Sequence, residues 1–268
     1  MRYLRMGIIF LFAISVALYG FAGCQTKIMA DTTIPTMTSE VETLEIPCTY
    51  TDKEILSGLH AQDERDGDLT DNIMLSKLSR FKKKGKCEAT YVVFDSANHS
   101  TTLKRDIVFT DYHSPKFTLE APLSFVAHST EMNQLKVGAM DMLDGDISSL
   151  VGIKEDNINY AVVGDYWVQV EVMNSFGDTS EMKLPVHVIS PEEAQIPVQL
   201  NQYLVYLKKG ESFYSKDYIK SVNHTDDIDS VKIDSNVDMD VPGCYEVKYT
   251  AVGENGNMGV SWLTVVVE

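Results

Sequence analysis

The amino-acid sequence predicts an all-β protein built from three tandem β-sandwich modules. One motif recurs three times, beginning at Gly85, Gly164 and Gly243, so that both repeat intervals are 79 residues. Apolar and polar residues alternate after each glycine, as expected for a strand that buries one face. Short strands separated by frequent turn signals favour β-sandwiches. The length of 268 residues suits two or three such domains.

Each copy of the motif is predicted to form the first strand of a hairpin that closes its module. The residues predicted to point inward are Cys87, Ala89, Tyr91 and Val93 in the first copy, Val168, Val170 and Val172 in the second, and Val247, Tyr249 and Ala251 in the third. A segment rich in Asn, Asp, Ser or Gly follows each copy, and such residues favour hairpin turns. A final strand rich in valine or other apolar residues then completes the module.

An aspartate-rich element lies upstream of the hairpin in the first two modules. Residues 61–69 (AQDERDGDL) match residues 139–147 (AMDMLDGDI) at an offset of 78. The aspartates of the two copies are Asp63, Asp66, Asp68, Asp141, Asp144 and Asp146. Calcium takes about six to eight oxygen ligands, and one loop could supply about half of them. Aspartates also accept main-chain N–H bonds in tight turns, so we expect structural turns and no metal, with calcium as the alternative.

These motifs together resemble the bacterial immunoglobulin-like domains that occur in tandem on Gram-positive surface proteins. The shared pattern is Ala-x-Asp-x-x-Asp-Gly-Asp followed by Leu or Ile, then Gly-x-Tyr with an alternating strand, a turn and a Val-rich strand. The resemblance covers about residues 43–268, although the third module keeps only the terminal hairpin clearly. It implies immunoglobulin-like β-sandwiches and an extracellular spacer or adhesive role, without catalysis. The predicted modules are 43–112, 113–190 and 191–268.

The N-terminus is predicted to be an export signal. Arg2 and Arg5 precede an uncharged apolar run over 6–21, which is the pattern of a secretory signal. The following Ala22-Gly23-Cys24 resembles the cleavage site of bacterial lipoproteins, which implies removal of residues 1–23 and a lipid on Cys24. The alternative is an uncleaved single-pass anchor helix. Either way, residues 24–42 form a tether, and the modules lie on the extracellular face of the cell membrane, since the positive residues stay inside.

Charge and motif content exclude several functional classes. The net charge of −16 disfavours nucleic-acid binding, which needs clustered Lys and Arg to neutralise phosphates. The six histidines have no short zinc-type spacing, and no nucleophile elbow or phosphate loop is present. We therefore expect neither enzymatic activity, nor a cofactor, nor a nucleic-acid partner.

The cysteines beyond Cys24 fall into two groups. Cys48 and Cys87 lie in the same predicted module, and we expect a disulfide between them, since such bonds form outside the cytoplasm. The alternative is a pair of buried thiols that act as small apolar residues. Cys244 lies one position out of the inward set, so we expect its side chain to face outward.

The function predicted from the sequence is that of a non-enzymatic cell-surface lipoprotein. Its modules would act as an extracellular spacer, or bind an unknown extracellular protein or glycan. The alternative is an accessory subunit of a cell-envelope enzyme or transport complex. Sandwich loops vary without a readable code, so the sequence does not name the ligand.

Overall fold

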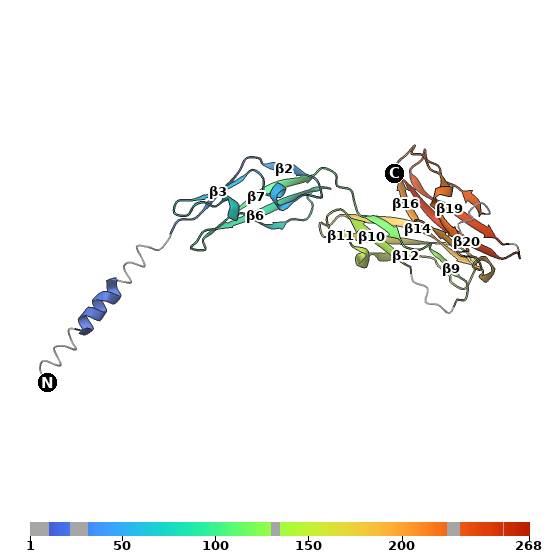
Figure 1. Ribbon diagram of the computed structural model, residues 1–268, viewed down its shortest axis with the longest axis horizontal. Helices are drawn as coiled ribbons and strands as arrows, with labels where there is room; N and C mark the ends of the chain where they lie inside the picture. The colour runs from blue at the N-terminus through green and yellow to red at the C-terminus, as the bar shows by residue number, and fades with distance from the viewer. Residues whose placement is uncertain (1–10, 22–31, 130–134, 224–230, 254) are drawn as a thin grey trace, which may run out of the picture. The chain divides into compact units, whose positions relative to one another are not determined.

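The computed structural model describes residues 11–21, 32–129, 135–223, 231–253 and 255–268. The chain divides into two compact units, Met1–Thr110 and Asp111–Glu268 (Figure 1). Residues 11–21 are helical. Among the described residues, the structure has no helix with both the length and the apolar character needed to cross a membrane. Cys24 and the residues around the predicted cleavage site lie outside the described part.

The first unit contains one immunoglobulin-like sandwich, here called module 1. Its elements are β1 (Thr36–Ser39), β2 (Thr43–Ile46), α2 (Asp52–Ile55), β3 (Leu59–Asp63), β4 (Gly67–Asp68), η1 (Thr70–Asn72), β5 (Met74–Leu78), β6 (Lys86–Phe94) and β7 (Ser100–Phe109). One sheet has the order β1-β3-β4 and the other the order β2-β7-β6-β5. Strand β2 pairs in parallel with β7, whereas β6 pairs antiparallel with both β5 and β7.

The second unit contains two further sandwiches. Module 2 consists of β8 (Lys116–Leu119), β9 (Ser124–Val126), β10 (Val137–Asp141), β11 (Gly145–Asp146), η2 (Ser148–Leu150), β12 (Gly152–Asp156), β13 (Gly164–Met173) and β14 (Thr179–Ile189). Module 3 consists of η3 (Pro191–Glu193), β15 (Val198–Leu200), β16 (Leu204–Leu207), η4 (Ser215–Tyr218), β17 (Ile219–Val222), β18 (Val231–Ser235), β19 (Gly243–Val252) and β20 (Met258–Val267). The larger sheets have the orders β12-β13-β14-β9 and β16-β20-β19-β18.

The terminal hairpin predicted from the repeats is present in all three modules, as β6–β7, β13–β14 and β19–β20. In each module the second hairpin strand also pairs in parallel with a short strand, which is β2, β9 or β16. The turns between the hairpin strands contain Asn98, Gly177 and Gly256, with φ of 66°, 85° and 78°. Asn and Gly suit such positive φ values, so the predicted turn chemistry is confirmed.

Strand alternation places the predicted residues in the cores. Cys87, Ala89, Tyr91 and Val93 have no exposed surface, and Val168, Val170, Val247 and Tyr249 are equally buried. The cores of modules 2 and 3 are built around these hairpin residues. The alternation predicted from the sequence is therefore in the correct register, because a slip of one residue would turn these side chains to the other face.

One buried charge in module 1 was not predicted. Arg105 of β7 is 2% exposed and donates hydrogen bonds to the carbonyl oxygens of Ile55 and Ser57, each at 2.8 Å. It also donates to the hydroxyl of Tyr91, at 3.1 Å. These bonds offset part of the cost of burying a guanidinium group, and they attach the end of α2 and the residues after it to the main sheet.

Candidate functional site

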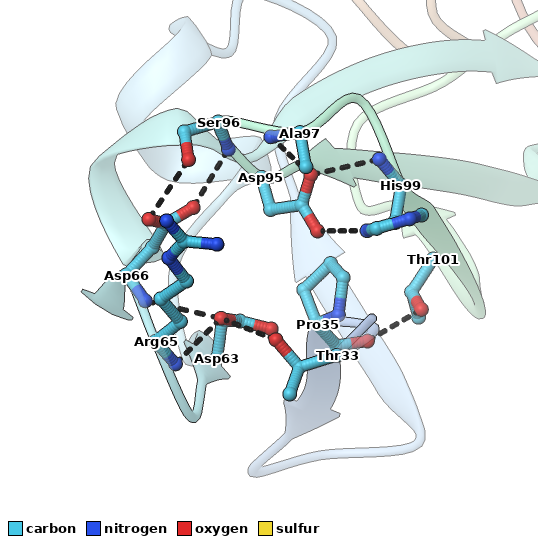
Figure 2. A network of polar contacts seen from close by, with 10 residues as sticks. All are labelled: Thr33, Pro35, Asp63, Arg65, Asp66, Asp95, Ser96, Ala97, His99 and Thr101. Atoms are coloured by element: carbon cyan, nitrogen blue, oxygen red, sulfur yellow. Dashed lines mark hydrogen bonds and ion pairs between the residues drawn. The ribbon is translucent and has the colours of Figure 1, made fainter. Parts of the chain in front are cut away.

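The first aspartate-rich loop is held by its own carboxylates (Figure 2). Asp63, at the end of β3, is 3% exposed. Its Oδ1 accepts the main-chain N–H groups of Arg65 at 2.8 Å and Asp66 at 3.0 Å, and the hydroxyl of Thr33 at 3.1 Å. This Asx turn positions Gly67, whose φ of 77° few side chains tolerate. The carboxylate of Asp63 therefore shapes the loop.

The second carboxylate of the loop reaches the hairpin turn of the same module. Asp66 accepts the N–H of Ser96 at 2.7 Å and the Ser96 hydroxyl at 2.9 Å. Beside it, the buried Asp95 accepts the N–H groups of Ala97 and His99 at 2.9 and 2.7 Å. Its other oxygen lies 2.7 Å from Nδ1 of His99. As Figure 2 shows, these carboxylates join two loops that are distant in sequence.

Module 2 repeats this arrangement almost bond for bond. Asp141 accepts the N–H groups of Leu143 and Asp144 at 2.9 and 3.0 Å. Asp144 accepts the N–H and the hydroxyl of Ser175 at 2.6 and 2.8 Å. Asp146 accepts the N–H and hydroxyl of Ser148, and these bonds hold the pKa of the Asp146 carboxyl below its usual value. Recurrence of the sequence element therefore reflects recurrence of a loop-to-hairpin connection.

The first residue of the hairpin turn differs between the two modules. Module 1 has Asp95 where module 2 has Asn174, whose amide donates to Asp141 at 3.0 Å and to the Tyr112 hydroxyl at 2.9 Å. Tyr112 in turn donates to Asp178 at 2.8 Å. Burial, followed by the hydrogen bond to Asp178, raises the pKa of the Tyr112 hydroxyl. The Asn174 amide and the Tyr112 hydroxyl, both neutral donors, thus connect the carboxylates of Asp141 and Asp178 in module 2.

The aspartates that could supply calcium ligands are engaged with protein donors. Asp68 accepts the N–H of Thr70 at 2.9 Å, and its hydrogen bonds to Thr70 hold the pKa of the carboxyl low. Across the described residues, no group of three or more His, Cys, Asp or Glu side chains is arranged to hold a metal ion. The geometry therefore supports the structural-turn interpretation, and calcium binding is left to the experiment proposed below.

Modules 2 and 3 meet at a buried histidine. His187 of β14 stacks on the indole of Trp262 of β20, with ring centroids 4.1 Å apart and ring planes 9° apart. Its Nδ1 lies 2.8 Å from Asp165 of module 2, and its Nε2 lies 2.7 Å from Glu246 of module 3. Burial opposes protonation, but the two carboxylates outweigh it, so the pKa of His187 is raised. The ring thus connects both modules.

Further contacts surround this histidine and fix the junction. Ile189, Val260 and Trp262 form a small apolar cluster of their own. Lys248 lies 5.1 Å from the centre of the Trp262 ring, on the opposite module from His187. Within module 3, next to the junction, Gly259 pairs with Ala194, and a Cβ at Gly259 would lie 1.8 Å from the carbonyl oxygen of Ile196. Only glycine permits this close approach of two backbones.

A second set of contacts ties the other edge of module 3 to module 2. The hydroxyl of Tyr206 in β16 accepts the main-chain N–H of Phe117 at 2.9 Å. Lys116 lies 4.5 Å from the centre of the Tyr206 ring and forms an ion pair with Glu268 at 2.7 Å. Leu204 packs against the core of module 2. The two modules are therefore joined through β14 and β20 at the histidine and through β8 and β16 at this second set of contacts.

An open groove lies beside this junction. Its volume is 600 Å³, and both modules line it. Module 2 contributes Thr118 and Glu120, and module 3 contributes Gln199, Asn201, Tyr203 and Lys220 among other residues. We call it the junction groove. Polar uncharged side chains make up half of its lining, and the rest consists of three leucines, one acidic and one basic side chain.

The cysteines follow the predicted positions, but the predicted bond is not formed. The structure has Cys48 and Cys87 as buried thiols rather than a disulfide. Burial, together with the charge of Asp106, raises the pKa of the Cys87 thiol to about 11, so the neutral thiol acts as a small apolar group. Cys244 is exposed, as expected. Shielding by its neighbours, and the Glu246 carboxylate, nonetheless raise the pKa of its thiol to about 11.

The repeats do not predict the junction between modules 2 and 3, although the sequence contains one signal for it. Strand β20 is apolar on both faces. On one face Leu263, Val265 and Val267 point into the core of module 3, and on the other face Val260 and Trp262 are buried as well. A strand that is apolar on both faces is typically covered on both sides. His187 and Arg105 carried no such signal, because a single polar residue in an alternating strand does not reveal its partners.

Comparison with known proteins identifies the type of module. Residues 201–267 match the family described as "Bacterial surface protein, Ig-like domain". The pesticidal crystal protein Cry22Aa of Bacillus thuringiensis is 29% identical over 181 residues, which are 62% of this chain and 24% of that protein. Internalin I of Listeria monocytogenes is 25% identical over 219 residues, which are 78% of this chain and 12% of that protein. The chain thus spans a quarter or less of the length of these curated relatives.

Two solved structures also match part of the chain. A structure of the CBM51-2 and INT domains of ZmpB from Clostridium perfringens, in complex with GlcNAc, covers 55% of this chain and 26% of that one, at 17% identity and a TM-score of 0.24. Mouse cadherin-23 EC22-24 covers 88% of this chain and 99% of that one, at 13% identity and a TM-score of 0.21. The repeated hairpin topology shows tandem immunoglobulin-like modules, of which residues 201–267 match the family of bacterial surface-protein Ig-like domains.

Proposed function

We propose that this protein is a non-enzymatic cell-surface protein whose immunoglobulin-like modules serve as an extracellular spacer and binding module. The observation that carries the proposal is the fixed pairing of modules 2 and 3 around His187 and Trp262, which leaves the junction groove open beside it. A spacer alone needs no pairing of this kind. A binding module gains from it, because a preformed site loses less entropy when the ligand binds.

The use of the buried carboxylates supports the non-enzymatic part of the proposal. Asp63, Asp95 and Asp141 are the buried acids of the loop networks, and each accepts two main-chain N–H groups. Acids held in this way shape turns and are poorly placed to transfer protons to a substrate.

Attachment to the membrane is the second part of the proposal. We infer that residues 1–23 direct export and that Cys24 carries a lipid, with the uncleaved anchor helix as the alternative. The sequence pattern around Cys24 supports this inference, and the surface-protein type of the modules fits an extracellular position. The relatives support a portable module, since the matched segments are small parts of longer bacterial proteins.

The test combines localisation with N-terminal chemistry. We expect the wild-type chain in the membrane fraction, digestible by protease added to intact cells, with a mature N-terminus at a lipid-modified Cys24. Cys24→Ser should abolish lipid modification. An intact Met1 would contradict the lipid anchor and support the uncleaved anchor helix. Protection from external protease would overturn the surface location. Recovery of a stoichiometric envelope complex after cross-linking would support the accessory-subunit alternative instead.

A further inference from the structure

We propose that the junction groove binds an uncharged polysaccharide chain. This inference rests on the proposed function as a binding module and names both the site and the ligand class. The groove has a volume of 600 Å³, within the range of roughly 300–1,000 Å³ that ligand sites occupy. Its walls come from the end of β8 in module 2 and from the β15–β16 connection and β17 in module 3.

The position of the groove makes it a preformed site. Its two walls cannot separate freely, because Tyr206 accepts the N–H of Phe117, one residue before the groove residue Thr118. Leu204, also in the groove lining, packs against the core of module 2. The wall residues are therefore held by the same contacts that join the modules, so binding would require little rearrangement.

Two of the amide side chains in the groove, those of Gln199 and Asn201, are each held at one end by a hydrogen bond. Gln199 accepts the hydroxyl of Ser221 through its Oε1, at 3.2 Å. Asn201 donates through its Nδ2 to the carbonyl oxygen of Asp217, also at 3.2 Å. Within the described residues, the Nε2 group of Gln199 and the Oδ1 atom of Asn201 have no protein partner. One donor and one acceptor are thus held in place and left available to a ligand.

A neutral sugar fits this chemistry better than other ligand classes. Each sugar hydroxyl both donates and accepts, and so does each side-chain amide and the hydroxyl of Thr118. The half-buried ring of Tyr203 beside Leu204 provides an apolar surface against which the C–H face of a pyranose can lie. An apolar ligand would cover the amides and the Thr118 hydroxyl without giving them hydrogen-bond partners, which costs free energy.

The charges of the groove and of the whole chain favour neutral glycans over anionic ones. The groove has one carboxylate, Glu120, and one ammonium group, Lys220, so it offers no excess positive charge to an anion. The whole chain has a net charge of −16, which repels anionic polymers at long range. An uncharged chain of hydroxyl-rich sugars avoids this repulsion.

The test uses the full chain on an array of neutral, sulfated and uronic-acid oligosaccharides, followed by calorimetric titration of the best-bound neutral one. The double variant Gln199→Ala with Asn201→Ala should weaken that binding by about tenfold, since it removes one hydrogen-bond donor and one acceptor from the groove. Gln195→Ala, an exposed amide of module 3 outside the groove lining, should leave affinity unchanged. Raising salt from 50 to 500 mM should also have little effect.

Three outcomes would overturn the proposal. They are binding confined to charged glycans, neutral-glycan binding that survives in the double variant, and absence of glycan binding by a chain that melts normally. A protein partner whose binding is lost in the double variant would reassign the groove to protein recognition. These results leave the surface location untouched, because external proteolysis tests that location independently.

Discussion

The imidazole of His187 and the indole of Trp262 stack nearly parallel, 4.1 Å apart, although they belong to different modules. Asp165 and Glu246 clamp the imidazole from its two nitrogens. The side chain of His187 is only 8% exposed. His187 therefore takes part in both the aromatic packing and the charge interactions of the junction. Its protonation state should affect the stability of the second unit.

The stability of the second unit should depend on pH through His187. The pKa of His187 is raised in the folded protein above its ordinary value of 6.5. The stabilising contribution of the protonated ring is therefore complete below about pH 6.5 and is lost as the pH rises through the folded-state pKa. We expect this dependence in thermal melts between pH 5 and 9.

His187→Gln should keep a hydrogen-bonding side chain but remove this component of the pH dependence. His113→Gln is the control, because His113 is exposed and its ring bonds to the adjacent carbonyl of Ser114. An identical pH profile in wild type and His187→Gln would show that the junction histidine is not the titrating group.

Trp262→Ala should destabilise the second unit by about 3–5 kcal/mol, the range for truncating a buried large aromatic residue. The indole is 7% exposed and packs between His187 and Lys248. Trp167→Ala is the matched control, since Trp167 lies in β13 of the same unit and contacts Lys183 through a cation–π interaction at 3.7 Å. That contact contributes about 0.5–1 kcal/mol at an exposed site. Chemical denaturation measures the free energy of unfolding of each variant. Equal losses in Trp262→Ala and Trp167→Ala would contradict the special role of Trp262.

Calcium should leave the melting temperature unchanged, because the loop aspartates are occupied by main-chain and hydroxyl donors. Asp66→Ala and Asp144→Ala should instead each cost about 1–2 kcal/mol, since each removes the hydrogen bonds to the hairpin-turn serine. Melts with calcium and with chelator make the comparison. A rise in melting temperature with calcium that disappears in both Asp66→Asn and Asp144→Asn would establish a cation site. With calcium at a hundredfold excess over its dissociation constant, such a site would stabilise the folded protein by about 2.7 kcal/mol.

Thiol labelling should distinguish the three cysteines of the modules. In the native protein only Cys244 should react, slowly at pH 7 and faster as the pH approaches about 11, because the thiolate is the reactive form. Cys48 and Cys87 are buried and should react only after unfolding. Peptide mapping after labelling in denaturant without reductant shows which cysteines are free thiols. Protection of both residues under those conditions, reversed by reductant, would show the disulfide that the sequence suggested.

Repeats and alternation were sufficient to predict the module type and the cores. The 79-residue spacing placed the three hairpins correctly, because a strand with one buried face has to alternate and a hairpin has to turn through residues that tolerate positive φ. Tyr249 and Val247 could be assigned to a core for this reason alone. The aspartates of the upstream element could be assigned to turns, since Asp63 and Asp141 act on N–H groups two and three residues away.

Contacts between distant residues could be decided only by the tertiary structure. Asp66 meets Ser96, Arg105 meets the carbonyl of Ile55, and His187 meets Trp262, each across a different sequence separation without a local pattern. The pairing of modules 2 and 3 is of this kind, and so is the junction groove. Sequence periodicity records which face of a strand is buried, whereas the identity of the surface that covers it depends on how complete modules pack. The sequence of this protein therefore determined its modules, and only packing between them determined where a ligand could bind.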